Sequence, residues 1–106
     1  MTDRTRLPNR RQCARYEFTH GGFRYFGVIG FRPGTNEPAE LFLQAGKAGT
    51  AIEAVARDAA ILASLALQHG ATVDDIRHAL TRLENNAPAG PVAALLDLFA
   101  KDGGAV

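Results

Sequence analysis

The sequence predicts an α+β fold, in which a three-stranded antiparallel β-meander is followed by three helices packed on one face of the sheet, giving two layers. Apolar and polar residues alternate with a period of two between residues 15 and 44, which is typical of strands. The connections between these runs are short, so neighbouring strands must be antiparallel. After residue 49 the apolar residues recur every three or four positions, as in helices. A chain of 106 residues has room for one such domain.

The first strand begins at residue 15, where Tyr16 and Phe18 alternate with polar residues. A glycine-rich turn leads into the second strand, at 23–31, whose Gly27 and Gly30 predict a bulge or the close approach of another element. The third strand, at 39–44, places the two leucines Leu41 and Leu43 opposite Phe42. With the helices on the other side, we expect the outer face to expose Arg24, Phe26 and Arg32.

The first helix begins after a capping box formed by Thr50 and Glu53, and it ends at Gly70. A helix so rich in apolar residues is expected to lie across the sheet and to be buried on more than one side, by the later helices or by a second subunit. Its predicted inward stripe is Ile52, Val55, Ala56, Ala59, Leu62, Ala63 and Ala66.

Two shorter helices follow. Thr72 and Asp75 repeat the capping pattern for the second helix, and Pro91 opens the third at a position that favours proline. The second helix is expected to bury Val73, Ile76, Leu80 and Leu83, and the third Val92, Leu95, Leu96 and Phe99.

Composition excludes several classes of protein. The longest apolar-rich segment, residues 59–67, is too short to span a bilayer, so we expect a cytoplasmic protein. Cys13 is the single cysteine and cannot form an internal disulfide. The three histidines are not paired at metal-ligand spacing, and the single serine, Ser64, lies inside an apolar helix. We therefore expect no metal, no cofactor and no catalytic site, and the chain is not predicted to be an enzyme by itself.

The segment QAGKAGTAIE, residues 44–53, resembles a phosphate-binding loop. A P-loop needs a glycine where this chain has Leu41 and a hydroxyl where it has Ala48, so nucleotide hydrolysis is not expected. Two interpretations remain open. The helix N-terminus with its neighbouring lysine binds an anion, or the glycines only permit the turn and the threonine caps the helix. The residues concerned are Gly46, Lys47, Gly49 and Thr50.

Charge is distributed unevenly along the chain. Residues 1–47 hold eight basic and four acidic side chains, whereas residues 48–106 hold four and seven. Residues 1–14 are interpreted as an extended basic arm, 15–102 as the domain and 103–106 as a frayed tail. Such a basic region suits phosphates or an acidic partner. Its candidate contacts are Arg10, Arg11, Arg15, Arg24 and Arg32.

Three segments carry a family resemblance: LPNRR, FRPGTNEPAELFLQAGKAGTAIEA and ILASLALQHGATVDDIRHAL. Together they resemble the TSCPD-type domain found at the C-terminal end of adenosylcobalamin-dependent ribonucleotide reductases and as short freestanding proteins. The resemblance runs from about Leu7 to Phe99. The signature cysteine of that family is absent, because Ala89, Gly90, Pro91 and Val92 align with the last four residues of the motif. Thiol or metal chemistry at that position is therefore not implied.

The resemblance implies a non-catalytic accessory or regulatory domain in deoxyribonucleotide metabolism, which acts by contact with a reductase subunit. The alternative is a small nucleic-acid- or nucleotide-binding module, in which the arginines contact phosphates and Tyr16, Phe18 or Phe26 stack on bases. A homodimer, formed through the long apolar helix or the edge of the third strand, is compatible with both.

Overall fold

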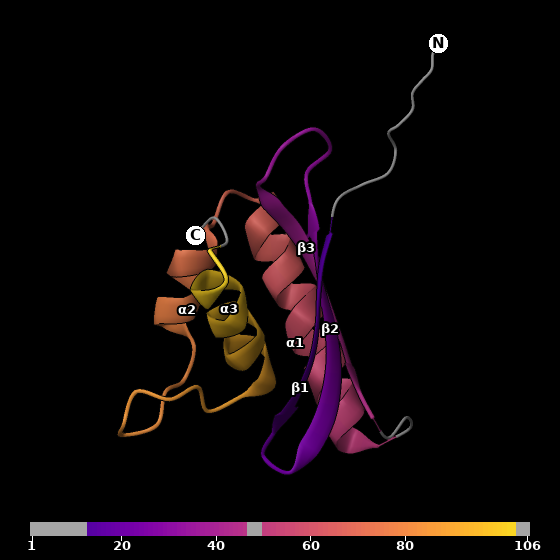
Figure 1. The fold of residues 1–106 in the computed structure, drawn as a ribbon, viewed down its shortest axis with the longest axis vertical. Coiled ribbons are helices and arrows are strands. Elements are labelled where there is room, and N and C mark those ends of the chain that lie inside the picture. Colours follow the sequence, from indigo (N-terminus) through magenta and orange to yellow (C-terminus); the bar gives the residue numbers. More distant parts are fainter. Residues whose placement is uncertain (1–12, 47–49, 104–106) are drawn as a thin grey trace.

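The sheet and the helices occur in the predicted order. The computed structural model describes residues 13–46 and 50–103. Three antiparallel strands form an open sheet in the order β1-β2-β3, and three helices follow them, which confirms the α+β class (Figure 1). The elements are β1 (Cys13–His20), β2 (Phe23–Phe31), β3 (Pro38–Ala45), α1 (Ala51–Gln68), α2 (Val73–Ala79) and α3 (Pro91–Lys101).

Alternation along the strands divides the sheet into a core face and an outer face. Ile29 of β2 lies opposite Leu41 of β3, and both side chains are buried with Leu43 in the core. The residues one step along the strands, Val28 and Phe42, also lie opposite each other and therefore share the outer face. The predicted directions of Leu41, Leu43 and Phe42 are confirmed.

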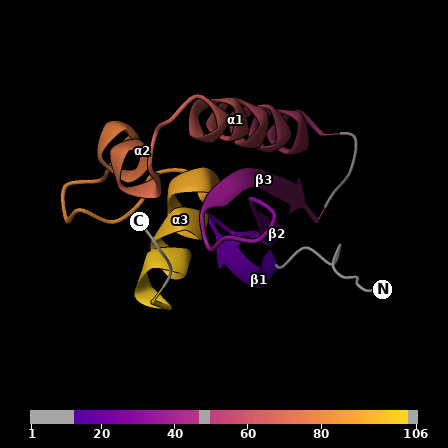
Figure 2. The ribbon, with the colours of Figure 1, turned by 90° about the horizontal axis from the view of Figure 1, so that it is seen from above.

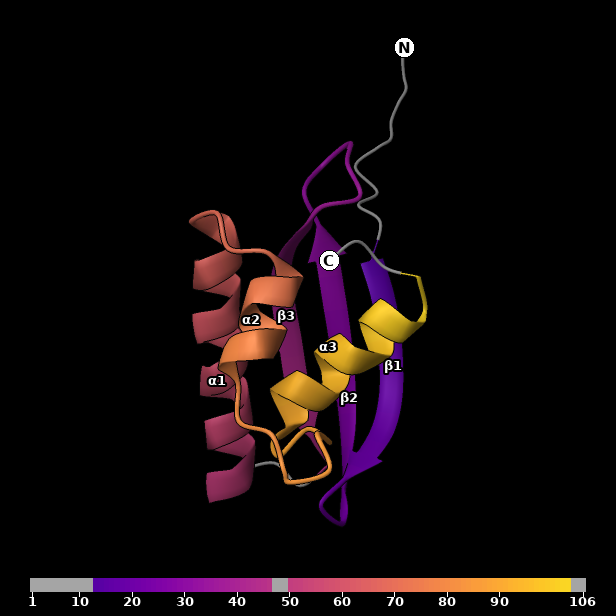
Figure 3. The same cartoon turned by 90° about the vertical axis from the view of Figure 1, so that its left-hand side faces the viewer.

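The helices meet the sheet in different ways. α1 follows β3 along its length, whereas α3 crosses β2 and β1, and α2 lies beside α3 (Figure 2, Figure 3). Leu95 of α3 is fully buried, and a Cβ atom on Gly27 would lie 2.8 Å from its Cδ1 atom. Gly27 therefore allows the close approach of α3 to β2 that the sequence predicted.

The outer edge of β3 is hydrogen-bonded to side chains of α1. Ser64 Oγ accepts the N–H of Leu41 at 2.8 Å and lies 3.2 Å from the carbonyl oxygen of the same residue. Gln68 Nε2 donates to the carbonyl of Ala39 at 3.1 Å. Edge strands with free polar groups invite pairing with other chains, and α1 covers this one. At Ala39 and Leu41, the edge of the third strand is thus bonded to α1, where the strand-to-strand dimer considered above would need it free.

The role of Ser64 leads to a stability prediction. Replacing Ser64 by alanine leaves the partly buried N–H of Leu41 without its acceptor, which should lower the free energy of unfolding by about 1–2 kcal/mol. Urea denaturation followed by circular dichroism measures this loss. Ser64→Thr retains the hydroxyl and serves as the matched control. An alanine variant as stable as the parent would show that the α1–β3 bond contributes nothing.

The predicted inward stripe of α1 is partly wrong. The structure buries Glu53, Ala56, Ala60, Ala63 and Leu67 against the sheet. By contrast, Ile52, Val55 and Leu62 are exposed, by 38%, 67% and 66%. The helix lies along β3 rather than across the sheet, so only one side of it is covered. The periodicity of this helix could not distinguish its two apolar sides.

Two element boundaries also differ from prediction. β1 begins at Cys13, within the segment that was assigned to the arm. α2 ends at Ala79 because Leu80 is extended, and the chain then forms a turn in which Arg82 pairs with Pro88. Leu83, expected on the inner face of this helix, is consequently 55% exposed. The turn residues of 84–88 thus override the helical spacing that precedes them.

Candidate interaction surface

The loop that resembles a phosphate site lies only partly within the described residues. Lys47 and Gly49 fall outside them, as do Arg10 and Arg11 of the arm. The N–H of Gly46 donates to the carbonyl of Arg24 at 2.8 Å, which continues the sheet by one bond beyond β3. Thr50 is the N-cap of α1, and its hydroxyl accepts the N–H of Glu53 at 3.1 Å. The cap interpretation is confirmed for Thr50, whereas the turn at residues 47–49 lies outside the described residues and anion binding stays a prediction.

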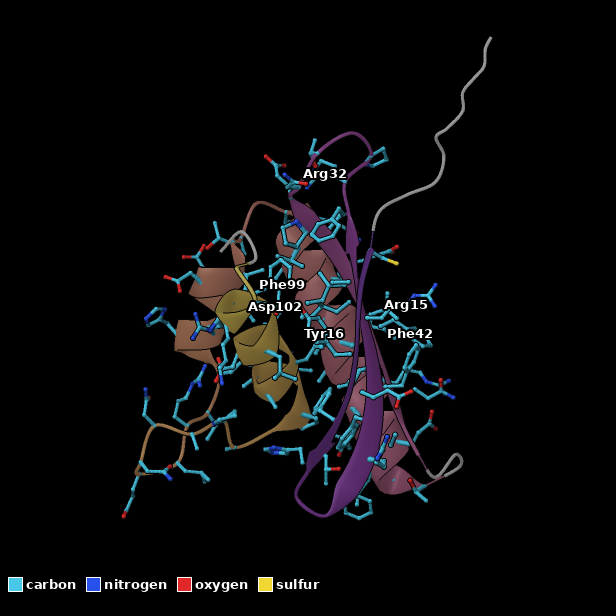
Figure 4. The ribbon with its side chains drawn as sticks, viewed as in Figure 1. Arg15, Tyr16, Arg32, Phe42, Phe99 and Asp102 are labelled. Atoms are coloured by element: carbon cyan, nitrogen blue, oxygen red, sulfur yellow. The ribbon has the colours of Figure 1, made fainter. Side chains whose placement is uncertain are left out.

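The three described arginines of the candidate site do not come together. Arg24 pairs with Glu17 at 3.0 Å near one end of the sheet. Arg32 pairs with Glu37 at 3.3 Å at the opposite end, where it follows β2 and lines a cavity of about 300 Å³ beside the start of α2. Arg32 is therefore not part of the outer face as expected. Arg15 lies on that face and has no ion pair among the described residues (Figure 4).

The outer face is organised in rungs across the three strands. Its central rung consists of Arg15, Val28 and Phe42, and Phe42 is 50% exposed. Figure 4 shows Arg15 and Phe42 pointing away from the helices, on the side opposite Tyr16 and Phe99. We call this surface the outer sheet face and define it by Arg15, Glu17, Arg24, Phe26, Val28, Glu40, Phe42 and Gln44.

Two aromatic residues proposed to stack on bases prove to face the helices. The hydroxyl of Tyr16 donates to Asp102 Oδ2 at 3.2 Å, and the ring of Phe18 stacks on that of Tyr25 with centroids 5.6 Å apart. Both side chains are partly buried against the core, so the expectation was wrong for them. On the outer sheet face, Phe42 takes their place as an exposed aromatic residue. Its alternation with two buried leucines was the sequence signal for this role.

The charges of the outer sheet face balance. It carries two arginines and two glutamates and therefore has no formal net charge. One of the arginines, Arg24, is already bound to Glu17 across the strands. The centre of the face, at Val28 and Phe42, is apolar. An apolar centre inside a charged rim is the usual anatomy of a protein–protein interface.

Three groups with shifted pKa values take part in contacts that hold the fold together. Burial, and then the hydrogen bond to Asp102, raises the pKa of Tyr16. The backbone N–H of Thr72 lowers the pKa of Asp75, which completes the predicted capping box of α2. The guanidinium of Arg82 lowers the pKa of Asp97 on α3. Each of these groups has a structural partner, so none of the three identifies a reactive centre.

Within residues 13–46 and 50–103, no three His, Cys, Asp or Glu side chains gather as a metal-ion site would require. No helix in the same part of the chain is long and apolar enough to cross a membrane.

Comparison with known proteins gave one match. A family model described as the TSCPD domain matches residues 3–101, which is nearly the whole chain. No curated protein and no solved structure matched.

Proposed function

Because the chain belongs to the TSCPD domain family, which is related to ribonucleotide reductases, we propose that it is a non-catalytic accessory domain of deoxyribonucleotide metabolism. It acts in the cytoplasm by binding a ribonucleotide reductase subunit through the outer sheet face. One observation carries the choice of surface: Phe42, at the centre of that face, is half-exposed beside Val28.

The chemistry of the outer sheet face supports a protein as the partner. Aromatic side chains contribute much of the binding energy at protein interfaces when they are desolvated at the centre of the contact. Phe42 occupies such a central position, with Val28 on the neighbouring strand and Arg15 beyond it. Glu17, Arg24 and Glu40 surround them with both signs of charge, which suits a specific polar rim.

Replacement of Phe42 tests this proposal. We expect Phe42→Asp to weaken binding of the purified domain to the ribonucleotide reductase of its own organism by at least about 30-fold, because an interface hot spot of this kind contributes about 2 kcal/mol or more. Biolayer interferometry with immobilised reductase measures the effect. Because Phe42 is half-exposed, the variant should fold as the parent does, which circular dichroism checks.

Leu83→Asp provides the matched control. Leu83 is exposed to a similar extent, 55%, but it lies in the turn after α2 and not on the sheet. Its replacement should leave reductase binding unchanged. Equal binding by the parent and Phe42→Asp would contradict the assignment of the surface, and no binding by the parent would contradict the partner.

A second candidate function is nucleic-acid or nucleotide binding. It is favoured by Arg15, which has no ion pair among the described residues and lies on the same rung as Phe42. A phosphate contact by Arg15 and stacking on Phe42 would give an affinity that falls steeply with salt. Binding to single-stranded and duplex DNA over a salt series distinguishes this function. A steep fall, with loss of binding in Arg10→Ala/Arg11→Ala, would support it, and no binding at low salt would exclude it.

A further inference from the structure

The outward side of α1 is an apolar strip that the domain itself leaves uncovered. Val55, Ile61, Leu62 and Leu65 are exposed by 67%, 50%, 66% and 47%. In Figure 2, α1 lies at the periphery of the molecule, next to β3, and none of the other described elements lies beyond it. A monomer that exposes several large apolar residues on one helix usually uses them for association.

The exposed residues of α1 follow the spacing of a helix–helix seam. Six exposed positions recur at alternating intervals of four and three, as the a and d positions of a coiled coil do. We call them the α1 seam: Ala51, Val55, Asp58, Leu62, Leu65 and His69. The first five lie within the helix, and the sixth is its C-cap. Ile61 flanks the seam and widens the apolar strip.

We propose that a second copy of this chain packs on the α1 seam in an antiparallel, two-fold symmetric arrangement. This inference is independent of the proposed function, which uses the outer sheet face. In an antiparallel pair, a positions face d positions of the partner helix. Pairing Leu62 with Leu65 of the other copy then pairs Asp58 with His69 of the other copy. Each seam thus offers one acid and one base at positions that the symmetry brings together.

The polar residues of the seam favour a second copy over an unrelated partner. Asp58 forms no hydrogen bond or ion pair among the described residues. His69 Nδ1 lies 2.9 Å from the carbonyl oxygen of Leu65, and its Nε2 atom has no hydrogen-bond partner within the same residues. The two residues stand at equal distances in sequence on either side of the Leu62–Leu65 centre, so a reversed copy of the same helix brings Asp58 of each copy to His69 of the other. This reciprocal pairing favours a copy of this chain as the partner.

The α1 seam is also a better surface for self-association than the outer edge of β3, which was the alternative. The outer edge of β3 is bonded to Ser64 and Gln68, so a second copy cannot extend the sheet there without breaking α1 away. With Leu62 facing Leu65 of the other copy, residues 59–68 of the two α1 helices overlap, which is about 15 Å at about 1.5 Å per residue. Leu62, Leu65 and the flanking Ile61 all lie within this overlap.

Sedimentation velocity of the purified chain, from micromolar to near-millimolar concentration, tests the proposal. The parent should be a dimer, and Leu62→Glu should weaken dimerisation by at least about 100-fold, because two glutamates would be buried without partners. Leu62 is 66% exposed, so thermal denaturation should show that the variant keeps its monomer fold. Leu83→Glu, at an exposed leucine outside α1, should leave the dimer intact.

Charge reversal tests the pairing itself. Asp58→Lys and His69→Glu should each weaken the dimer about tenfold, and the double variant should restore it, because the new lysine of one copy would then meet the new glutamate of the other. The two positions lie three turns apart along one helix, so only contact between copies can produce the rescue. A parent that stays monomeric, a Leu62→Glu variant that stays dimeric, or a double variant as weak as the single ones would overturn the proposal.

Discussion

Replacing Leu95 by alanine is expected to lower the free energy of unfolding by about 3 kcal/mol, which corresponds to a loss of about 15 °C in Tm. Leu95 is fully buried and packs from α3 directly onto Gly27 of β2, so the truncation leaves a cavity where helix and sheet approach most closely. Thermal and urea denaturation followed by circular dichroism measure both quantities. A loss below about 1 kcal/mol would mean that α3 does not pack there.

A double-mutant cycle sharpens this prediction. Gly27→Ala alone should destabilise the protein by about 1–3 kcal/mol, because its new Cβ atom would lie within 3.0 Å of two Leu95 methyl groups. In the Leu95→Ala background the same methyl group enters the cavity, so Gly27→Ala should cost little or should stabilise. With Val73→Ala, a buried truncation in α2, the effect of Gly27→Ala should be additive. Additivity in both backgrounds would contradict the contact.

Asp97→Asn is expected to cost about 2 kcal/mol of stability at neutral pH, since it removes the charge that binds two arginines. Asp97 Oδ1 lies 2.8 Å from Arg77 Nε, and its Oδ2 lies 2.6 Å from Arg82 Nη1. These bonds join α3 to α2 and to the turn that follows it. Urea denaturation of both proteins measures the difference.

The pH dependence of this difference has a defined sign. The folded pKa of Asp97 is lowered, chiefly by hydrogen bonding to Arg82, so the carboxylate stabilises the fold above its ordinary pKa of 3.8. That stability is lost as the pH falls from 3.8 through the folded pKa. The parent and Asp97→Asn should therefore differ fully near neutral pH and converge in acid. A difference that grows as the pH falls below about 4 would contradict the ion-pair origin of the effect.

The sequence predicted the sheet well because its signals are local. Alternation places Leu41 and Leu43 inward and Phe42 outward whatever the neighbouring elements do. Gly27 and Gly30 were expected to mark a bulge or the close approach of another element, and the structure has both, with Leu95 against Gly27 and a register shift after Gly30. The capping residues Thr50 and Thr72 likewise marked the helix starts.

The parts that could not be predicted depend on where whole elements dock. α1 is apolar on two sides, and the sequence could not show that Ala56, Ala60 and Ala63 face β3 while Val55 and Leu62 face outward. The prediction of the candidate site was incomplete for the same reason. Tyr16 and Phe18 follow the correct alternation, but only the position of α3 shows that their side of the sheet is covered.

We propose above that this domain works by binding a ribonucleotide reductase through the outer sheet face. Affinity purification of the tagged chain from extracts of its own organism, with the recovered proteins identified by mass spectrometry, tests it most directly. A reductase subunit should be recovered with the parent and with Leu83→Asp, and lost with Phe42→Asp. Recovery of no reductase subunit with the parent, or equal recovery with Phe42→Asp, would contradict the claim.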